Sequence, residues 1–175
     1  MSEHREAAAR ALFAPLDLLV VEVDQYPVGV EGVNKWMLPE SDRLALIRWG
    51  LPMMEGFRLV VNLQEGVSPE LDVRGRKYYS LGLFAEHEVG VCVGSGEVWG
   101  FNPDANPPDS FVNSSVANFV ETAWRWYWVY KEVKPLRFDI ELYDLLDDFI
   151  NFSVRLDPQV GSAVSSMWRG IIESW

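Results

Sequence analysis

Three aspartates on one face of a predicted helix are the residues whose types and spacing come nearest to a reactive site. The apolar pattern predicts a helix over Ile140–Val154, and Asp144, Asp147 and Asp148 fall on its polar face. Such a trio could hold a divalent cation, or supply the acid and base of a hydrolase or small-ligand enzyme. The same spacing is typical of the solvated side of an amphipathic helix, which is the interpretation we favour. A carboxylate-based enzyme, with or without a metal, is the alternative.

The chain has few residues that could form a cysteine–histidine nucleophile or a zinc site. The chain has one cysteine, Cys92, and two histidines, His4 and His87. His87 and Cys92 are five positions apart on one predicted strand, so their side chains point to opposite faces of the sheet and cannot form a catalytic dyad. One cysteine and two histidines also leave a zinc site almost without ligands. We therefore assign no catalytic residue, no cofactor and no metal ligand.

The charge balance points away from nucleic acid and towards a protein partner. The chain has 26 acidic and 15 basic side chains, a formal net charge of −11. Such a surface repels phosphates and anionic membranes, whereas a basic protein is attracted to it. The single cysteine rules out an intramolecular disulfide, and no apolar run resembles a signal peptide or a membrane span. These features predict a cytoplasmic protein with no direct contact to nucleic acid or membrane.

Aromatic side chains are the most distinctive remaining feature, since the chain has eight tryptophans. A long helix is predicted to end near Tyr130, and Trp128 projects away from the centre of its apolar stripe. Burial of most of these tryptophans under the C-terminal helices is the interpretation we favour. The alternative is that one or two stay exposed beside acidic residues and form an aromatic-anchored protein interface. The candidate partner-binding residues are Trp128, Glu97, Asp104 and Asp109. Two of these, Asp104 and Asp109, also flank Pro107-Pro108 as turn residues do.

The elements that position these residues centre on the stretch from Tyr78 to Tyr130. Two runs alternate apolar and small residues as half-buried strands do: Tyr79, Leu81 and Leu83, then Val89, Val91 and Val93. Gly94-Ser95-Gly96 predicts a hairpin turn into a strand over Glu97–Phe101. Asn113-Ser114-Ser115 then offers a cap for the long helix. The stripe of that helix is Val116, Phe119, Val120, Ala123, Tyr127 and Tyr130.

The flanking segments extend this core in both directions. Strands are predicted within Asp17–Val28 and Phe57–Leu63, and a helix over Ser41–Trp49 is capped by Ser41 and ended by Gly50. After Asp157-Pro158 an apolar stripe predicts one last helix, with the residues Val160, Val164, Met167, Trp168, Ile171, Ile172 and Trp175. The fold class is therefore α+β, a mainly antiparallel sheet packed by helices with a helical C-terminal third. We expect one domain over residues 1–175.

Several short motifs recur in a recognisable order. A short helix ends in Gly50-Leu51-Pro52, a glycine hairpin gives the run SGEVW, the run FVNSSVANFVE opens the long helix, and Asp157-Pro158 precedes a tryptophan. This order resembles the SUKH superfamily, especially its fourth, actinobacterial-type subgroup, over Ser41 to Trp175. The residues that carry the resemblance are Gly50, Leu51, Pro52, Gly96, Val98, Val112, Asn113, Ser114, Ser115, Phe119, Asp157, Pro158 and Trp168.

The resemblance implies a function as well as a fold. It implies an α+β immunity protein, a non-enzymatic binder that neutralises a cognate toxin of the same bacterium. Such toxins are often nucleases or nucleic-acid deaminases, whose basic active-site faces would suit an acidic inhibitor. The resemblance also implies that the Asn113–Ser115 run is a helix cap. A regulatory adaptor of the SUKH type, without a toxin partner, is a further alternative.

Overall fold

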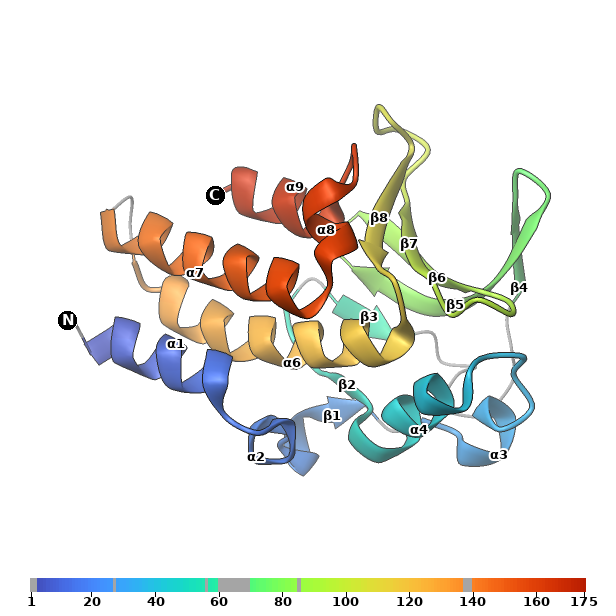
Figure 1. The fold of residues 1–175 in the computed structure, drawn as a ribbon, viewed down its shortest axis with the longest axis horizontal. Helices are drawn as coiled ribbons and strands as arrows, with labels where there is room; N and C mark the ends of the chain where they lie inside the picture. The colour runs from blue at the N-terminus through green and yellow to red at the C-terminus, as the bar shows by residue number, and fades with distance from the viewer. Residues whose placement is uncertain (1–2, 27, 56, 60–69, 85, 137–139) are drawn as a thin grey trace.

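The computed structural model of the chain describes residues 3–26, 28–55, 57–59, 70–84, 86–136 and 140–175. Its fold is α+β, as predicted, with an antiparallel sheet, helices packed against it and a helical C-terminal third (Figure 1). Helices α1 (Glu3–Phe13), α6 (Val116–Val133) and α7 (Ile140–Leu156) lie side by side. No helix in these described ranges is long and apolar enough to cross a membrane.

The main sheet contains six of the described strands, in the order β3-β5-β6-β7-β8, with β4 also paired to β5. Their bounds are β3 (Phe57–Leu59), β4 (Glu70–Val73), β5 (Arg76–Phe84), β6 (His87–Cys92), β7 (Val98–Phe101) and β8 (Asp109–Asn113). Every pairing in it is antiparallel. A second sheet pairs β1 (Gln25–Tyr26) with β2 (Leu51–Pro52). The predicted hairpin after Cys92 joins β6 to β7.

A bulge in β5 changes which of its residues face the core. The register shifts between Ser80 and Gly82, and this places Leu81 opposite no residue of β6. Tyr79 and Leu81 are buried as predicted, but Leu83, beyond the bulge, is 46% exposed. An extra residue in one strand reverses the alternation that follows it, because the side-chain period of a strand is two.

Helix α6 begins and packs as its sequence predicts. Ser115 is its N-cap, with a side chain that accepts the Asn118 N–H at 3.1 Å. The predicted stripe is buried except for Tyr130, which is half-buried. Trp124 and Trp126 are also buried, because α1, α4 (Glu40–Trp49) and α7 surround the rest of the helix. The long helix is therefore central rather than a surface layer.

The N-terminal predictions are only partly right. Residues 16–24 form the short helix α2 (Leu16–Leu19) and a 3₁₀ turn, η1 (Glu22–Asp24), and only β1 is extended. Tertiary contacts override the β propensity there, because the Leu19 carbonyl accepts the indole N–H of Trp128. Helix α4 begins at Glu40 after Pro39, so Ser41 does not cap it. Short helix α3 (Val30–Val33) precedes it. Of the strand predicted over Phe57–Leu63, residues 60–63 lie outside the described ranges.

The prediction of a single helix after Pro158 is wrong. The structure has two helices, α8 (Pro158–Ser162) and α9 (Met167–Glu173). The segment between them pairs with the edge of the sheet, where the Phe111 N–H donates to the Ser165 carbonyl at 2.9 Å. This pairing draws the backbone out of the helical path, and Val164, predicted as a core residue, is fully exposed.

Candidate partner-binding surface

Aromatic side chains cover the face of the sheet opposite α6. Tyr78 and Phe101 meet edge to face with ring centroids 4.9 Å apart, and Trp99 and Phe111 do so at 5.5 Å. Gly90 lies beneath the first pair, where a Cβ would come within 3.1 Å of Tyr78 and 3.2 Å of Phe101. We call these four aromatics the outer face. A side chain at position 90 would therefore crowd the rings of Tyr78 and Phe101.

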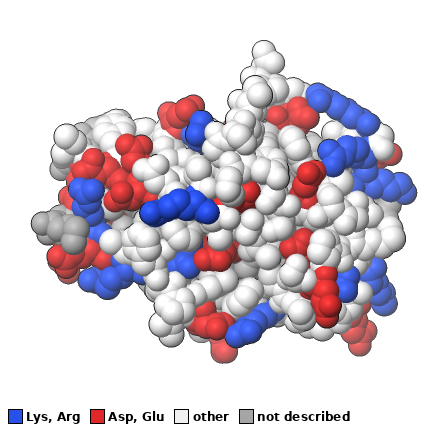
Figure 2. All heavy atoms as spheres, in the orientation of Figure 1, with Lys and Arg blue, Asp and Glu red and all other residues white. Residues whose placement is uncertain are grey.

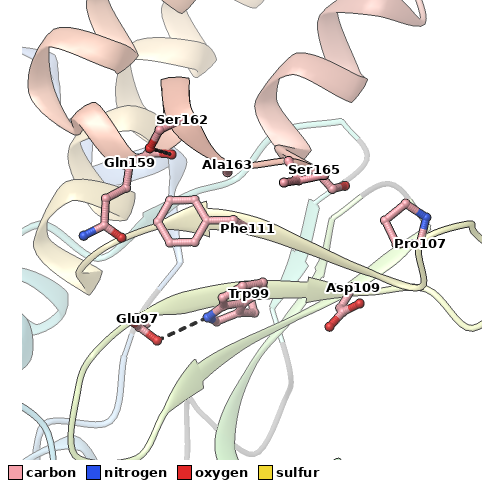
Figure 3. A pocket seen from close by; sticks show the side chains of 10 residues that line it. Glu97, Trp99, Pro107, Asp109, Phe111, Gln159, Ser162, Ala163 and Ser165 are labelled. Carbon is pink, nitrogen blue, oxygen red and sulfur yellow. Dashed lines mark hydrogen bonds between the residues drawn. The ribbon is translucent and has the colours of Figure 1, made fainter.

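A groove of about 570 Å³ runs along this face beside α8. Figure 3 shows Trp99 and Phe111 on neighbouring strands, with Gln159 and Ser162 of α8 across the groove. Its lining is Glu97, Trp99, Pro107, Asp109, Phe111, Gln159, Ser162, Ala163, Val164 and Ser165. The exposed Val164 side chain and the half-buried Trp99 give it an apolar surface open to solvent.

Two of the predicted partner-binding carboxylates lie in this groove, and each is paired with an arginine. Glu97 accepts from Arg76 at 2.9 Å and from the Trp99 indole at 3.5 Å. Asp109 accepts from Arg74 at 3.0 Å. The hydrogen bond to Glu97 raises the pKa of Arg76 above its ordinary value. The groove is therefore amphipathic, with locally balanced charge rather than a purely acidic lining.

The other two predicted partner-binding residues lie elsewhere. Asp104 is exposed in the loop between β7 and β8 and is not part of the groove lining. Trp128 is half-buried, and its indole donates to the Leu19 carbonyl at 2.8 Å. It lines a separate hollow with Leu18 and Glu132 that shares no residue with the groove. The structure thus brings Glu97 and Asp109 together and leaves Asp104 and Trp128 apart.

Charge is unevenly spread over the surface (Figure 2). Basic side chains gather where β4 turns into β5, which contributes Arg74, Arg76 and Lys77, while acidic ones gather over α7. The α7 aspartates are partly engaged by α1, since Arg5 lies 2.8 Å from Asp144 and 3.6 Å from Asp148. A guanidinium thus occupies the face on which the metal alternative depends. The described residues contain no group of three His, Cys, Asp or Glu placed to hold a metal.

Four of the residues that carry the SUKH resemblance, Asn113, Ser114, Asp157 and Trp168, meet in one buried polar network. The Asp157 carboxylate accepts from the Asn113 side chain at 3.2 Å and from the Ser114 N–H at 2.6 Å. The Trp168 indole donates to Asn113 at 3.0 Å. Asp157 also caps α8, whose first residue is Pro158. This network joins β8 and α6 to the two last helices, so these residues act structurally.

Two motif glycines fit close approaches of the chain. Gly50 ends α4 with φ +54°, and a Cβ there would lie 2.6 Å from the Gln25 side chain, next to the pairing of Gln25 with Pro52. Gly96 has φ +79°, and its Cβ would lie 2.0 Å from Oδ2 of Asp42. A side chain at either position would therefore collide with a neighbouring element.

Asp42 is a structural residue that sequence reasoning missed. It is 1% exposed, and its Oδ1 accepts the Ala117 N–H at 3.0 Å in the first turn of α6. Burial raises its pKa above the ordinary value, against the lowering effect of these backbone hydrogen bonds. Its position in the first turn of α4 gave no signal, because acidic residues are common there.

The fold is α+β, and its surface groove combines exposed apolar side chains with carboxylates that are paired with arginines. A family model described as SUKH-4 immunity protein matches residues 29–174, and the chain belongs to this family. This membership confirms the resemblance and supports an immunity function. Neither a curated protein nor a solved structure is significantly similar to the chain. The matched range includes all of the groove and the buried network, and it excludes α1 and α2.

Proposed function

We propose that the protein is a non-enzymatic immunity protein that binds and neutralises a cognate bacterial toxin through the groove between the outer face and α8. Membership of the SUKH-4 family supports an immunity role, and the groove supplies a surface suited to protein binding. The observation that carries the proposal is the exposed Val164 beside Trp99, an apolar anchor flanked by polar groups.

The apolar part of the groove would supply most of the binding free energy. Val164 is exposed to solvent on a backbone that is hydrogen-bonded to β8 through Ser165. Its burial by a partner would therefore cost little backbone conformational entropy. Trp99 is half-buried and already packed edge to face against Phe111, as binding hot spots commonly are. The backbone beside Val164 and the ring of Trp99 are therefore in place in the free protein.

The charged part of the groove would select the partner. Glu97 and Asp109 could exchange their arginine partners for basic groups of a toxin, within a molecule whose net charge is −11. A nuclease or nucleic-acid deaminase presents such groups where it binds phosphates. Asp104, on the adjoining loop, could add to this attraction. Trp128 is a weaker candidate anchor, since its indole N–H is already bonded.

The test is co-expression of the protein with the product of the neighbouring open reading frame. We expect a stoichiometric complex that abolishes the toxicity of that neighbour. Val164→Asp should weaken binding by about tenfold or more, because a charge would replace an apolar anchor in a desolvated contact. Ile140→Asp is the matched control, since Ile140 is also exposed, at 79%, but lies at the start of α7.

The outcomes separate the proposal from its alternatives. A harmless neighbour that forms no complex would refute the immunity proposal and favour the adaptor. A complex that Val164→Asp leaves unchanged would show that the toxin binds another face.

A further inference from the structure

A second hollow, of about 510 Å³, lies on the helix side of the sheet, between α9 and the ends of β6 and β8. His87, Ser110, Ser166, Met167 and Ile171 are among the residues that line it. It adjoins the groove, because Pro107 and Ser165 line both. A partner in the groove would therefore lie next to its mouth.

Three buried polar atoms in this lining have no hydrogen-bond partner among the described residues. They are Nδ1 of His87, Oγ of Ser110 and Oγ of Ser166. Ser110 is 5% exposed and Ser166 is 8% exposed, so neither hydroxyl faces bulk solvent. Buried polar groups are nearly always hydrogen-bonded, so three exceptions around one hollow point to an occupant with hydrogen-bonding groups of its own, either water or a group of a partner.

A glycine of β7 lies against three of the side chains that line the hollow. A Cβ on Gly100 would lie 3.1 Å from Oγ of Ser110, 3.2 Å from Sδ of Met167 and 3.4 Å from Cβ of His87. The space between these three side chains therefore depends on glycine. Met167 is unbranched and flexible, so it can shift to admit a guest to the buried atoms.

The chemistry of the lining favours a cation over an anion. Glu86 is exposed at this hollow, and no lysine or arginine is among its lining residues. Burial lowers the pKa of His87, the larger effect, although Glu86 raises it. The imidazole is therefore neutral at neutral pH, and one ring nitrogen can accept a hydrogen bond. The two serine hydroxyls can accept as well.

We propose that this hollow receives an arginine side chain of the bound toxin, an inference that rests on the proposed function. The guanidinium donates to Ser110, Ser166 and His87, and Glu86 balances its charge. Its aliphatic stem packs against Met167 and Ile171. Arginine suits the site better than lysine, because its five N–H donors can satisfy several acceptors at once.

The first test measures toxin affinity by titration calorimetry with Ser110→Ala/Ser166→Ala. We expect binding at least about tenfold weaker, because two acceptors for a buried cation are lost. Thermal stability should stay equal or rise, since hydroxyls without partners are removed. Ser174→Ala is the matched control, because the Ser174 hydroxyl, also in the lining, already donates to the Ile171 carbonyl. Unchanged affinity of the double variant for a toxin that binds the wild type would overturn the proposal.

A second test needs no toxin and so separates this inference from the proposed function. Amide resonances of the free protein are followed during titration with ethylguanidinium, and with propionamide and propionate as neutral and anionic controls. We expect saturable shifts at Ser110, Ser166 and Gly170 with ethylguanidinium alone, absent in the double variant. No saturable shift would mean that the hollow holds water only, and equal shifts with all three probes would mean that it does not select a cation; either result would overturn the proposal. If no toxin binds the wild type, the proposed function falls and this titration alone decides the site.

Discussion

At the scale of residues, the buried network around Asp157 explains why the family motifs have their composition. One carboxylate accepts from the Asn113 side chain and the Ser114 backbone, and it also accepts from the Gln159 N–H at 3.3 Å. Asn113 in turn accepts from Trp168. The Asn113 side chain is buried and Ser114 is half-buried, so these two donors would lose their acceptor where water is scarce.

We expect Asp157→Ala to lower the free energy of unfolding by about 3 kcal/mol, because it leaves the buried Asn113 amide and the half-buried Ser114 N–H without this acceptor and removes a helix cap. Urea denaturation would measure this loss, provided that the free energy of unfolding depends on urea concentration with the same slope in both variants. Asp147→Ala is the control, because Asp147 is exposed on α7. A loss no larger than that of the control would show that the network does not stabilise the fold.

At the scale of elements, the β6–β7 hairpin acts as a contact between the sheet and two helices. Gly96 in its turn lies against Asp42 of α4, and Asp42 accepts a hydrogen bond from the first turn of α6. The Gly94 N–H donates to the Met37 carbonyl at 2.7 Å, which ties the same turn to the segment before α4. The position of α4 thus depends on a turn that is distant in the sequence.

Two glycines of this turn provide a matched pair of variants. Gly94 has φ +91°, and a Cβ there would meet nothing within 4 Å, so Gly94→Ala should cost about 1 kcal/mol of backbone strain alone. Gly96→Ala should cost about 2 kcal/mol more, because its Cβ collides with Asp42, which cannot move without losing the Ala117 hydrogen bond. Thermal or urea unfolding of both variants measures the difference. Equal losses would contradict the contact with Asp42.

At the scale of the whole molecule, the net charge of −11 is not concentrated in the groove. The carboxylates of the groove are paired with arginines, while acidic side chains gather over α7 (Figure 2). The long-range field would therefore attract a basic toxin, and the apolar groove would hold it. Attraction at a distance acts on the association rate, whereas close contacts act on the dissociation rate.

The association rate constant of the toxin complex should accordingly fall by about tenfold when salt rises from about 0.05 M to about 0.5 M, because exposed charges are screened. The dissociation rate constant should change by less than about twofold. Stopped-flow fluorescence, with the tryptophans as probes, would give both constants. An association rate that does not depend on salt would show that the acidic surface does not steer the toxin.

The fold class, the central helix and the family could all be predicted from the amino-acid sequence. The helical stripe of α6 and the cap at Ser115 depend on residues a few positions apart, and local backbone geometry is enough to interpret them. Composition excluded a disulfide, and motif order indicated the SUKH resemblance.

The residues that form the proposed surface for a partner could be found only once the chain was folded. Val164 fits an apolar helical stripe, yet pairing of the neighbouring Ser165 with β8 leaves it fully exposed. Glu97 meets Arg76, and His87 lines the same hollow as Ser166, because strands and helices distant in sequence pack together. Local pattern carries no information about such contacts, since they depend on the register and packing of the whole chain.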